Sequence, residues 1–202
     1  MARISLDPPR SLTYRIVEWY CRRTFRAVPD PVAALGHNTR VLRAELRFER
    51  SVAKFSTLDP VLSELAVLAS AARIGCSWCM DFGYWEGHRL GISPEKLRAV
   101  PFWREHMELF SELELAVLEY ADAMTETTAE TEPTVSDELT TMLLTQLGEP
   151  AFVELTVIIG IENLRSRVNS ALGLRSQGFA DRCEAKEARE GSRPARPVPS
   201  RQ

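Results

Sequence analysis

The sequence predicts an all-helical (all-α) protein, on three observations. Apolar residues recur at helical spacing in successive segments from Ser11 onward, and helix-start signals precede several of these segments. Ten Gly and twelve Pro in 202 residues leave room for long helices. With 45% apolar and 26% charged residues, a chain of this length can form one compact domain with a sizeable core.

The N-terminal part is expected to begin with an extended lead-in and to continue as helices. Residues 1–10 contain an Asp-Pro-Pro sequence, which resists helix formation. Ser11 is a suitable N-cap for the first helix, and further helical segments cover about 31 to 56. The latter carry a basic stripe, typical of a solvated or ion-paired face, made of Arg40, Arg43, Arg47 and Arg50.

Two helices around residue 75 are expected to carry the chemistry. Asp59 is a good N-cap and Pro60 a good first residue for the first of them, which contains Glu64 within an apolar run. Gly75 separates it from a second helix, over residues 76 to about 90. A glutamate is usually exposed, but burial of Glu64 near thiols would raise its pKa and suit it to proton transfer.

The second half of the chain is expected to form four more helices. They cover 94 to 100 (ended by Pro101), 111 to 125, 137 to 147 (closed by Gly148) and a long apolar stretch from Pro150. The acidic, threonine-rich residues 125–134 predict a mobile loop. Order is expected to fade after Gly173, and residues 185–202 are basic with three prolines, typical of a flexible tail. The helical domain is therefore predicted to span residues 11–184.

Cys76 and Cys79 are the residues most suited to chemistry. Residues three apart on a helix share one face, so the two sulfurs can bridge with modest adjustment. Near a helix N-terminus, free N–H groups and the helix dipole favour thiolate over thiol. A redox-active dithiol is therefore favoured over two alternatives that stay open. In the first, both cysteines are buried and pack as small apolar residues. In the second, they bind zinc, but Cys21 and Cys183 are too remote to supply a second pair of ligands.

Composition restricts the class of partner. A net charge of −3 gives no sign of the basic surface that nucleic-acid-binding proteins need. The sequence has no secretory signal pattern and no uncharged apolar run near the roughly 18 residues that span a bilayer, so a cytoplasmic protein without membrane contact is expected. Four cysteines in 202 residues are too few for a protein stabilised by many disulfides. In a reducing compartment, a cysteine pair would alternate between dithiol and disulfide rather than stay closed.

The spacing of three residues resembles a known family. Glu64 stands twelve positions before Cys76, Cys79 follows, and Gly-Ile-Ser-Pro-Glu occupies 91–95. This pattern resembles the core of the alkylhydroperoxidase D-like (AhpD-like) and carboxymuconolactone decarboxylase family. Flanking sequences are similar to longer members, so the likeness covers about residues 30 to 180. It implies an AhpD-like helical bundle that assembles as a homo-oligomer.

The resemblance also implies a peroxidase mechanism. In the redox branch the second cysteine attacks a peroxide and the first resolves the sulfenic acid as a disulfide. Carried over, Cys79 is peroxidatic, Cys76 is resolving, and Glu64 belongs to the proton relay. The implied substrate is a small peroxide, no cofactor is bound, and an external dithiol or a lipoyl group, as on a protein, is the reductant.

The chain departs from the redox branch at Gly83. That branch usually has a histidine there, four residues after the second cysteine, where it can accept the thiol proton. Loss of a positioned base commonly costs about 10²-fold to 10⁴-fold in rate. On a helix, Asp81 and His88 point away from the face of Cys79. His37 could replace the base only through tertiary contact and is kept as a further candidate catalytic residue.

Two alternatives to the peroxidase stay open. One is a non-catalytic helical oligomer in which the disulfide is a redox sensor or a staple. The other is a lactone decarboxylase-like enzyme, whose activity would not depend on the thiols. The peroxidase interpretation requires the sulfurs to exchange electrons with an outside molecule, so sulfurs sealed from solvent, or bound to a metal, would argue against it.

Overall fold

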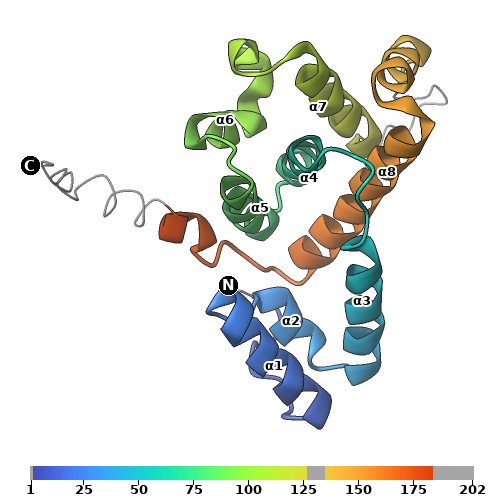
Figure 1. Ribbon diagram of the computed structural model, residues 1–202. Coiled ribbons are helices and arrows are strands. Elements are labelled where there is room, and N and C mark those ends of the chain that lie inside the picture. The colour runs from blue at the N-terminus through green and yellow to red at the C-terminus, as the bar shows by residue number, and fades with distance from the viewer. Residues whose placement is uncertain (1, 127–134, 184–202) are drawn as a thin grey trace, which may run out of the picture.

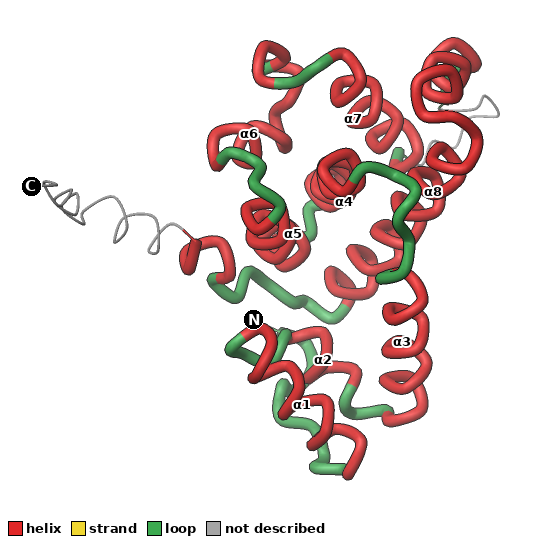
Figure 2. The backbone as a smooth tube through the Cα atoms, in the orientation of Figure 1, coloured by secondary structure: helices red, strands yellow, loops and turns green. Residues whose placement is uncertain are grey.

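The computed structural model describes residues 2–126 and 135–183. Throughout these two ranges the chain consists of helices and connecting loops, without a strand (Figure 1, Figure 2). The predicted all-α class is confirmed. Residues 127–134 of the loop expected at 125–134, and the tail expected at 185–202, lie outside the described residues.

The helices begin close to the expected capping residues. Their bounds are α1 (Leu12–Phe25), α2 (Asp30–Leu35), α3 (Thr39–Val52), α4 (Pro60–Ile74), α5 (Ser77–Arg89), α6 (Pro94–Ala99), α7 (Glu112–Thr125) and α8 (Asp137–Ala171), with 3₁₀ helices η1 (Val100–Glu105) and η2 (Met107–Leu109). The side chains of Ser11 and Asp59 accept N–H groups of the first turns of α1 and α4, as expected of N-caps. Helix α6 ends at Ala99, one residue before the expected end at Val100, and the chain continues through Pro101 as the 3₁₀ helix η1.

Helix α4 lies at the centre of the fold. Figure 1 shows it with α5, α7 and α8 around it, and each of these packs against it. Leu65, Ala66 and Ala71 of α4 have no exposed surface, and the small alanines let the neighbouring helices approach closely. Any group on α4 is therefore close to several other helices.

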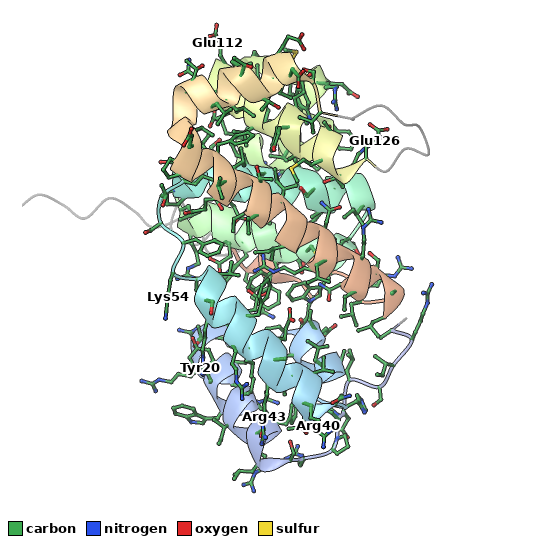
Figure 3. All side chains as sticks on the ribbon, turned by 90° about the vertical axis from the view of Figure 1, so that its right-hand side faces the viewer. Tyr20, Arg40, Arg43, Lys54, Glu112 and Glu126 are labelled. Carbon is green, nitrogen blue, oxygen red and sulfur yellow. A yellow bond between two sulfur atoms is a disulfide. The ribbon has the colours of Figure 1, made fainter. Side chains whose placement is uncertain are left out.

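Helices α1 to α3 form a group next to the ends of α5 and α8 (Figure 1). Within this group Arg43 of α3 donates to the Thr13 hydroxyl of α1 (Figure 3). The group is tied to α8 by Arg165, which donates to both carboxylate oxygens of Glu49. The four arginines of the α3 stripe are exposed, as expected.

Helix α8 is interrupted at Gly148. This residue has φ 73° and ψ 162°, a conformation that suits glycine, and Pro150 follows at the start of the second segment. In the described part of the chain, α8 is also the one helix long and apolar enough to cross a membrane by length and composition. Every stretch of 18 residues between Glu149 and Ala171 contains four charged residues, so an apolar stretch of that length has to include the break at Gly148. Because α8 packs on α4 and α7, we describe it as a helix of the bundle.

The expectation that order fades after Gly173 is wrong. Leu174, Phe179 and Cys183 are buried, and the chain from 179 turns into a helix again. The residues 174–183, here called the C-terminal segment, pack against α5. Their backbone amides have partners on α5, described below, and no such partner can be read from the sequence of the segment itself.

Helices α1 and α8 each present several apolar side chains to solvent. On α1 they are Leu12, Ile16, Trp19 and Tyr20, and on α8 they include Val153, Val157, Leu164 and Val168. Each set recurs at helical spacing and so lies on one face of its helix. Exposed apolar faces of this kind are typical of protein interfaces.

Candidate active site

A sharp turn at Gly75 connects α4 to α5. Gly75 ends α4 in the left-handed conformation, with φ 79°, and its N–H donates to the carbonyls of Ala71 and Ala72. This conformation costs glycine little, and it would strain a residue with a side chain. Cys76 follows at once as the N-cap of α5. The turn therefore places Cys76 at the end of the helix where free N–H groups collect.

Cys76 and Cys79 are joined as a disulfide, with their Cα atoms 5.3 Å apart. The Sγ of Cys76 accepts the N–H of Cys79 at 3.3 Å. The Sγ of Cys79 accepts a hydrogen bond from Nδ2 of Asn169, on α8, at 3.4 Å. The two sulfurs thus have different partners, a backbone amide for Cys76 and a side-chain amide for Cys79. Within residues 2–126 and 135–183, no group of three or more His, Cys, Asp or Glu side chains is placed to hold a metal ion.

Both cysteines are buried. Cys76 is 1% exposed and Cys79 is 6% exposed. They belong to a cluster that includes Leu174 and Phe179 of the C-terminal segment and Ala34 of α2. An outside molecule can therefore reach the disulfide only after part of this cover moves, and Cys79 has the larger residual exposure.

Asp81 holds the C-terminal segment in place. Its Oδ2 accepts the N–H groups of Gln177 at 2.7 Å and Phe179 at 3.1 Å, and its Oδ1 accepts the N–H of Ala180 at 2.8 Å. The side chain is buried, so these three bonds replace its hydration. Both carboxylate oxygens of Asp81 are therefore engaged by the C-terminal segment.

Gln177 links the C-terminal segment to two further elements. Its Oε1 accepts from the indole N–H of Trp78 and from the backbone N–H of Asp30, and its Nε2 donates to the carbonyl of Val28. A single side chain thus joins α5, the loop before α2 and the C-terminal segment.

The aromatic residues of α5 form a packed cluster. Trp78 and Phe82 are stacked with their ring centroids 5.1 Å apart, and Phe179 meets Phe82 edge-on at 5.1 Å. Phe25 of α1 contacts Phe82 and Trp85. The rings are therefore part of the core beside the disulfide.

Glu64 of α4 has a buried oxygen without a hydrogen-bond partner. The residue as a whole is half-buried, but its Oε1 has no exposed surface and no partner in the described part of the chain. Desolvation, together with the nearby charges of Glu86 and Glu162, raises the pKa of Glu64 to about 8, and Arg165 opposes this shift. Near neutral pH the carboxyl group therefore carries a proton, so the burial and the raised pKa that were considered for Glu64 are both present.

Gly83 lies directly against Glu64. A Cβ built on Gly83 would lie 3.0 Å from Oε1 of Glu64 and 2.8 Å from Cδ2 of Leu68. The position where the redox branch has a histidine therefore faces the unpartnered carboxyl oxygen, and Leu68 fills the space that a larger residue would need.

A second buried carboxyl group, Glu162 of α8, lies in the same region. It is 3% exposed, its Oε1 accepts the hydroxyl of Ser166 at 2.6 Å, and its Oε2 lies 3.7 Å from Arg165. Desolvation raises the pKa of Glu162 to about 7, against the effect of Ser166 and Arg165. The site therefore contains two carboxyl groups that gain or lose protons near neutral pH.

Of the four candidate residues, the structure joins Cys76 to Cys79 and places Glu64 against Gly83, four residues after Cys79. Cys76, Cys79 and Glu64 lie on the hairpin of α4 and α5, whereas His37 is exposed and its Nε2 donates to the carbonyl of Ser5 at 2.8 Å. The imidazole makes no hydrogen bond with a sulfur or with Glu64. Reasoning from the sequence missed Asn169, although Glu162, Ser166 and Asn169 recur at i, i+4 and i+7 as a polar stripe on an apolar helix.

The fold is that of the AhpD-like helical proteins, and it carries a Cys-x-x-Cys pair at the start of a helix. The model of the carboxymuconolactone decarboxylase family matches residues 40–123. An uncharacterised relative, YnjA of Escherichia coli K12, is 35% identical over 179 residues, which cover 85% of this chain and 94% of YnjA. The chain belongs to the carboxymuconolactone decarboxylase family.

Solved structures share the fold. An uncharacterised peroxidase-related protein from Silicibacter sp. TM1040 has a TM-score of 0.76 at 15% identity, over 89% of this chain and 94% of that one. The debrominase Bmp8, in complex with 2,3,4-tribromopyrrole, has a TM-score of 0.73 at 17% identity, over 92% and 99%. ATU0492 of Agrobacterium tumefaciens, named as an AhpD antioxidant defence protein, has a TM-score of 0.63 at 24% identity, over 70% and 94%.

Proposed function

We propose that the protein is a thiol oxidoreductase of the AhpD type that reduces small peroxides through Cys76 and Cys79. The observation that carries this proposal is the disulfide at the start of α5, a helix that also contacts, at Gly83, the buried Glu64 carboxyl group, which holds a proton near neutral pH. Family membership and the peroxidase-related names of structural neighbours support the same class of reaction.

The cycle has three balanced steps. The Cys79 thiolate attacks a peroxide, an S–O bond forms as the O–O bond breaks, and the departing alkoxide takes up a proton to give an alcohol and Cys79 sulfenic acid. The Cys76 thiol then displaces water from the sulfenic acid and forms the disulfide. An external dithiol, either on a protein or a lipoyl group, reduces the disulfide and becomes oxidised itself. No bound cofactor is needed.

The different partners of the two sulfurs fit these roles. Cys79 keeps slightly more residue exposure than Cys76, which supports Cys79 as the cysteine that peroxide and reductant meet first. When a reductant attacks Cys79, Cys76 leaves as a thiolate, and the N–H of Cys79 and the start of α5 stabilise that charge. A leaving thiolate stabilised in this way departs faster.

Glu64 acts as the proton store in this proposal. It returns a proton to the alkoxide, and it recovers one when the Cys79 thiol ionises. Because Gly83 has no side chain, the carboxyl group takes this part without an intervening imidazole. The cost of the missing imidazole predicts slow turnover relative to histidine-containing members of the redox branch.

Peroxide turnover with dihydrolipoamide as reductant tests the proposal. We expect the Cys79→Ser variant to lose all turnover, and the Cys76→Ser variant to stop after one peroxide, with a sulfenic acid at Cys79 that dimedone labels. The matched control is Cys21→Ser, which changes a buried thiol on α1 and should leave turnover unchanged. Equal turnover in the Cys79→Ser variant, or no turnover in the parent, would overturn the proposal.

A non-catalytic disulfide is the second candidate function. The burial of both cysteines and the absence of an imidazole at Gly83 favour it. A redox sensor or staple predicts that the double variant, Cys76→Ser with Cys79→Ser, changes stability or assembly while the parent turns over no peroxide. Turnover of a lactone that survives removal of both thiols would instead indicate a decarboxylase.

We also propose that the protein is a homo-oligomer in a reducing, cytoplasmic compartment. The apolar faces of α1 and α8 support the first part, because burial against a second copy would remove them from water. Light scattering on the parent and on Val157→Glu tests this. We expect a larger particle for the parent and a loss of mass for the variant, and a monomeric parent would refute it.

A further inference from the structure

The strongest unexplained feature of the site is Asn169. Its side chain is 5% exposed, near the end of a helix whose other buried residues are mostly apolar. Asparagine is a poor helix former, and a buried amide costs free energy unless it has partners. In the described part of the chain, the hydrogen bond recorded for this side chain is the one to Sγ of Cys79, at 3.4 Å. A neutral disulfide sulfur is a weak acceptor, whereas a thiolate is a strong one.

Apart from the start of α5, the surrounding charged side chains do little to favour a thiolate at Cys79. Helices α4, α5 and α8 carry the carboxyl groups of Glu64, Asp81, Glu86 and Glu162, of which Glu64 holds a proton near neutral pH. The cation of this region, Arg165, is engaged by Glu49 and lies close to Glu162. A nearby negative charge disfavours ionisation of a thiol, so a neutral donor has to compensate.

We propose that Asn169 is the residue that stabilises Cys79 as a thiolate, a task for which the residue at position 83 offers no side chain. Helix α8 packs against α5, and Asn169 of α8 reaches the sulfur of Cys79 from there. The amide N–H₂ of Asn169 donates a hydrogen bond to the sulfur, and this bond becomes stronger as negative charge develops on the sulfur. The amide itself neither gains nor loses a proton. The inference rests on the proposed function for its role in turnover, but the hydrogen bond is testable without a substrate.

The thiol pKa of Cys79 is the measurement that tests this inference. In a Cys76→Ser background the rate of iodoacetamide alkylation at Cys79 is followed against pH, with mass spectrometry of the Cys79 peptide to exclude the other thiols. Asn169→Leu removes the donor while it keeps a similar side-chain volume. The lost hydrogen bond to a charged group contributes about 1.5 to 3 kcal/mol, and one pKa unit corresponds to about 1.4 kcal/mol, so the midpoint should rise by about one to two pH units. Asn169→Asp replaces the donor by a carboxylate and should raise it further.

Asn163→Leu is the matched control. Asn163 lies on the same helix and donates to Thr125 and to a carbonyl of α8, not to a sulfur. It should leave the Cys79 midpoint unchanged, and circular dichroism checks that all variants are folded. A Cys79 midpoint in Asn169→Leu and Asn169→Asp that equals the parent's would overturn the inference.

The two proposals can fail separately. If the parent turns over no peroxide but the Asn169 variants shift the midpoint, the inference stands and the peroxidase proposal fails. If the parent is active and the Asn169 variants change neither the midpoint nor the rate of sulfenic acid formation, the inference alone fails.

Discussion

Replacement of Glu64 by glutamine should change how the stability of the protein depends on pH. The pKa of Glu64 is raised to about 8 from its ordinary value of 4.5, mainly by desolvation. Between these pH values the unfolded chain has lost the proton and the folded protein has kept it, so the folded state binds more protons. Stability therefore falls as the pH rises through this window and the loss is complete above about pH 8.

The magnitude follows from the width of this window. One pKa unit corresponds to about 1.4 kcal/mol, so the parent should lose about 3 kcal/mol through Glu64 between pH 5 and pH 8. Glu64→Gln cannot ionise and avoids this loss. Any cost of burying an amide there is the same at both pH values, so the difference between the two pH values isolates the ionisation.

Urea unfolding at pH 5 and pH 8 measures the effect. We expect the stability of Glu64→Gln, relative to the parent, to rise by about 3 kcal/mol from pH 5 to pH 8, which for a domain of this size is a shift of roughly 6 to 12 °C in Tm. Glu112→Gln is the exposed control on α7 (Figure 3). Parallel curves for the parent and Glu64→Gln would refute the reasoning, because Glu64 would then ionise in the folded protein as it does in the unfolded chain.

Three further predictions concern the surroundings of the site. Gly83→Ala should lower the free energy of unfolding by about 1 to 3 kcal/mol, because its Cβ meets side chains of α4, whereas Gly160→Ala, with open space, should stabilise α8; urea unfolding checks both. Asp81→Asn weakens the bonds to the C-terminal segment and should speed reduction of the disulfide by dithiothreitol about tenfold; an unchanged rate would show that reductants enter elsewhere. Glu162→Gln removes a negative charge near Glu64 and should move the Glu64 transition in the stability profile to lower pH; a fixed transition would contradict the coupling.

Local signals in the sequence were sufficient for most of the fold. The caps at Ser11 and Asp59, and the break at Gly148, depend on residues within one turn, so short-range chemistry decides them. The pairing of Cys76 with Cys79 is local in the same sense. The sequence did not decide whether Glu64 is exposed or buried, because its burial depends on the helices that surround α4.

Contacts between distant parts of the chain could not be predicted in this way. Asn169 meets Cys79 across 90 positions, and the amides bound by Asp81 follow it by almost a hundred. Neither contact has a periodic pattern that identifies both partners. The order of the C-terminal segment was missed for this reason, since a carboxylate on α5 supplies what the segment's own sequence does not.

The three bonds between Asp81 and the backbone have a practical consequence. The N–H groups of Gln177, Phe179 and Ala180 can exchange with deuterium only when the C-terminal segment leaves the carboxylate. Their exchange rates therefore report the rate at which the C-terminal segment opens and exposes the sulfurs to solvent. This opening rate is an upper limit on how fast an outside thiol can react through this route.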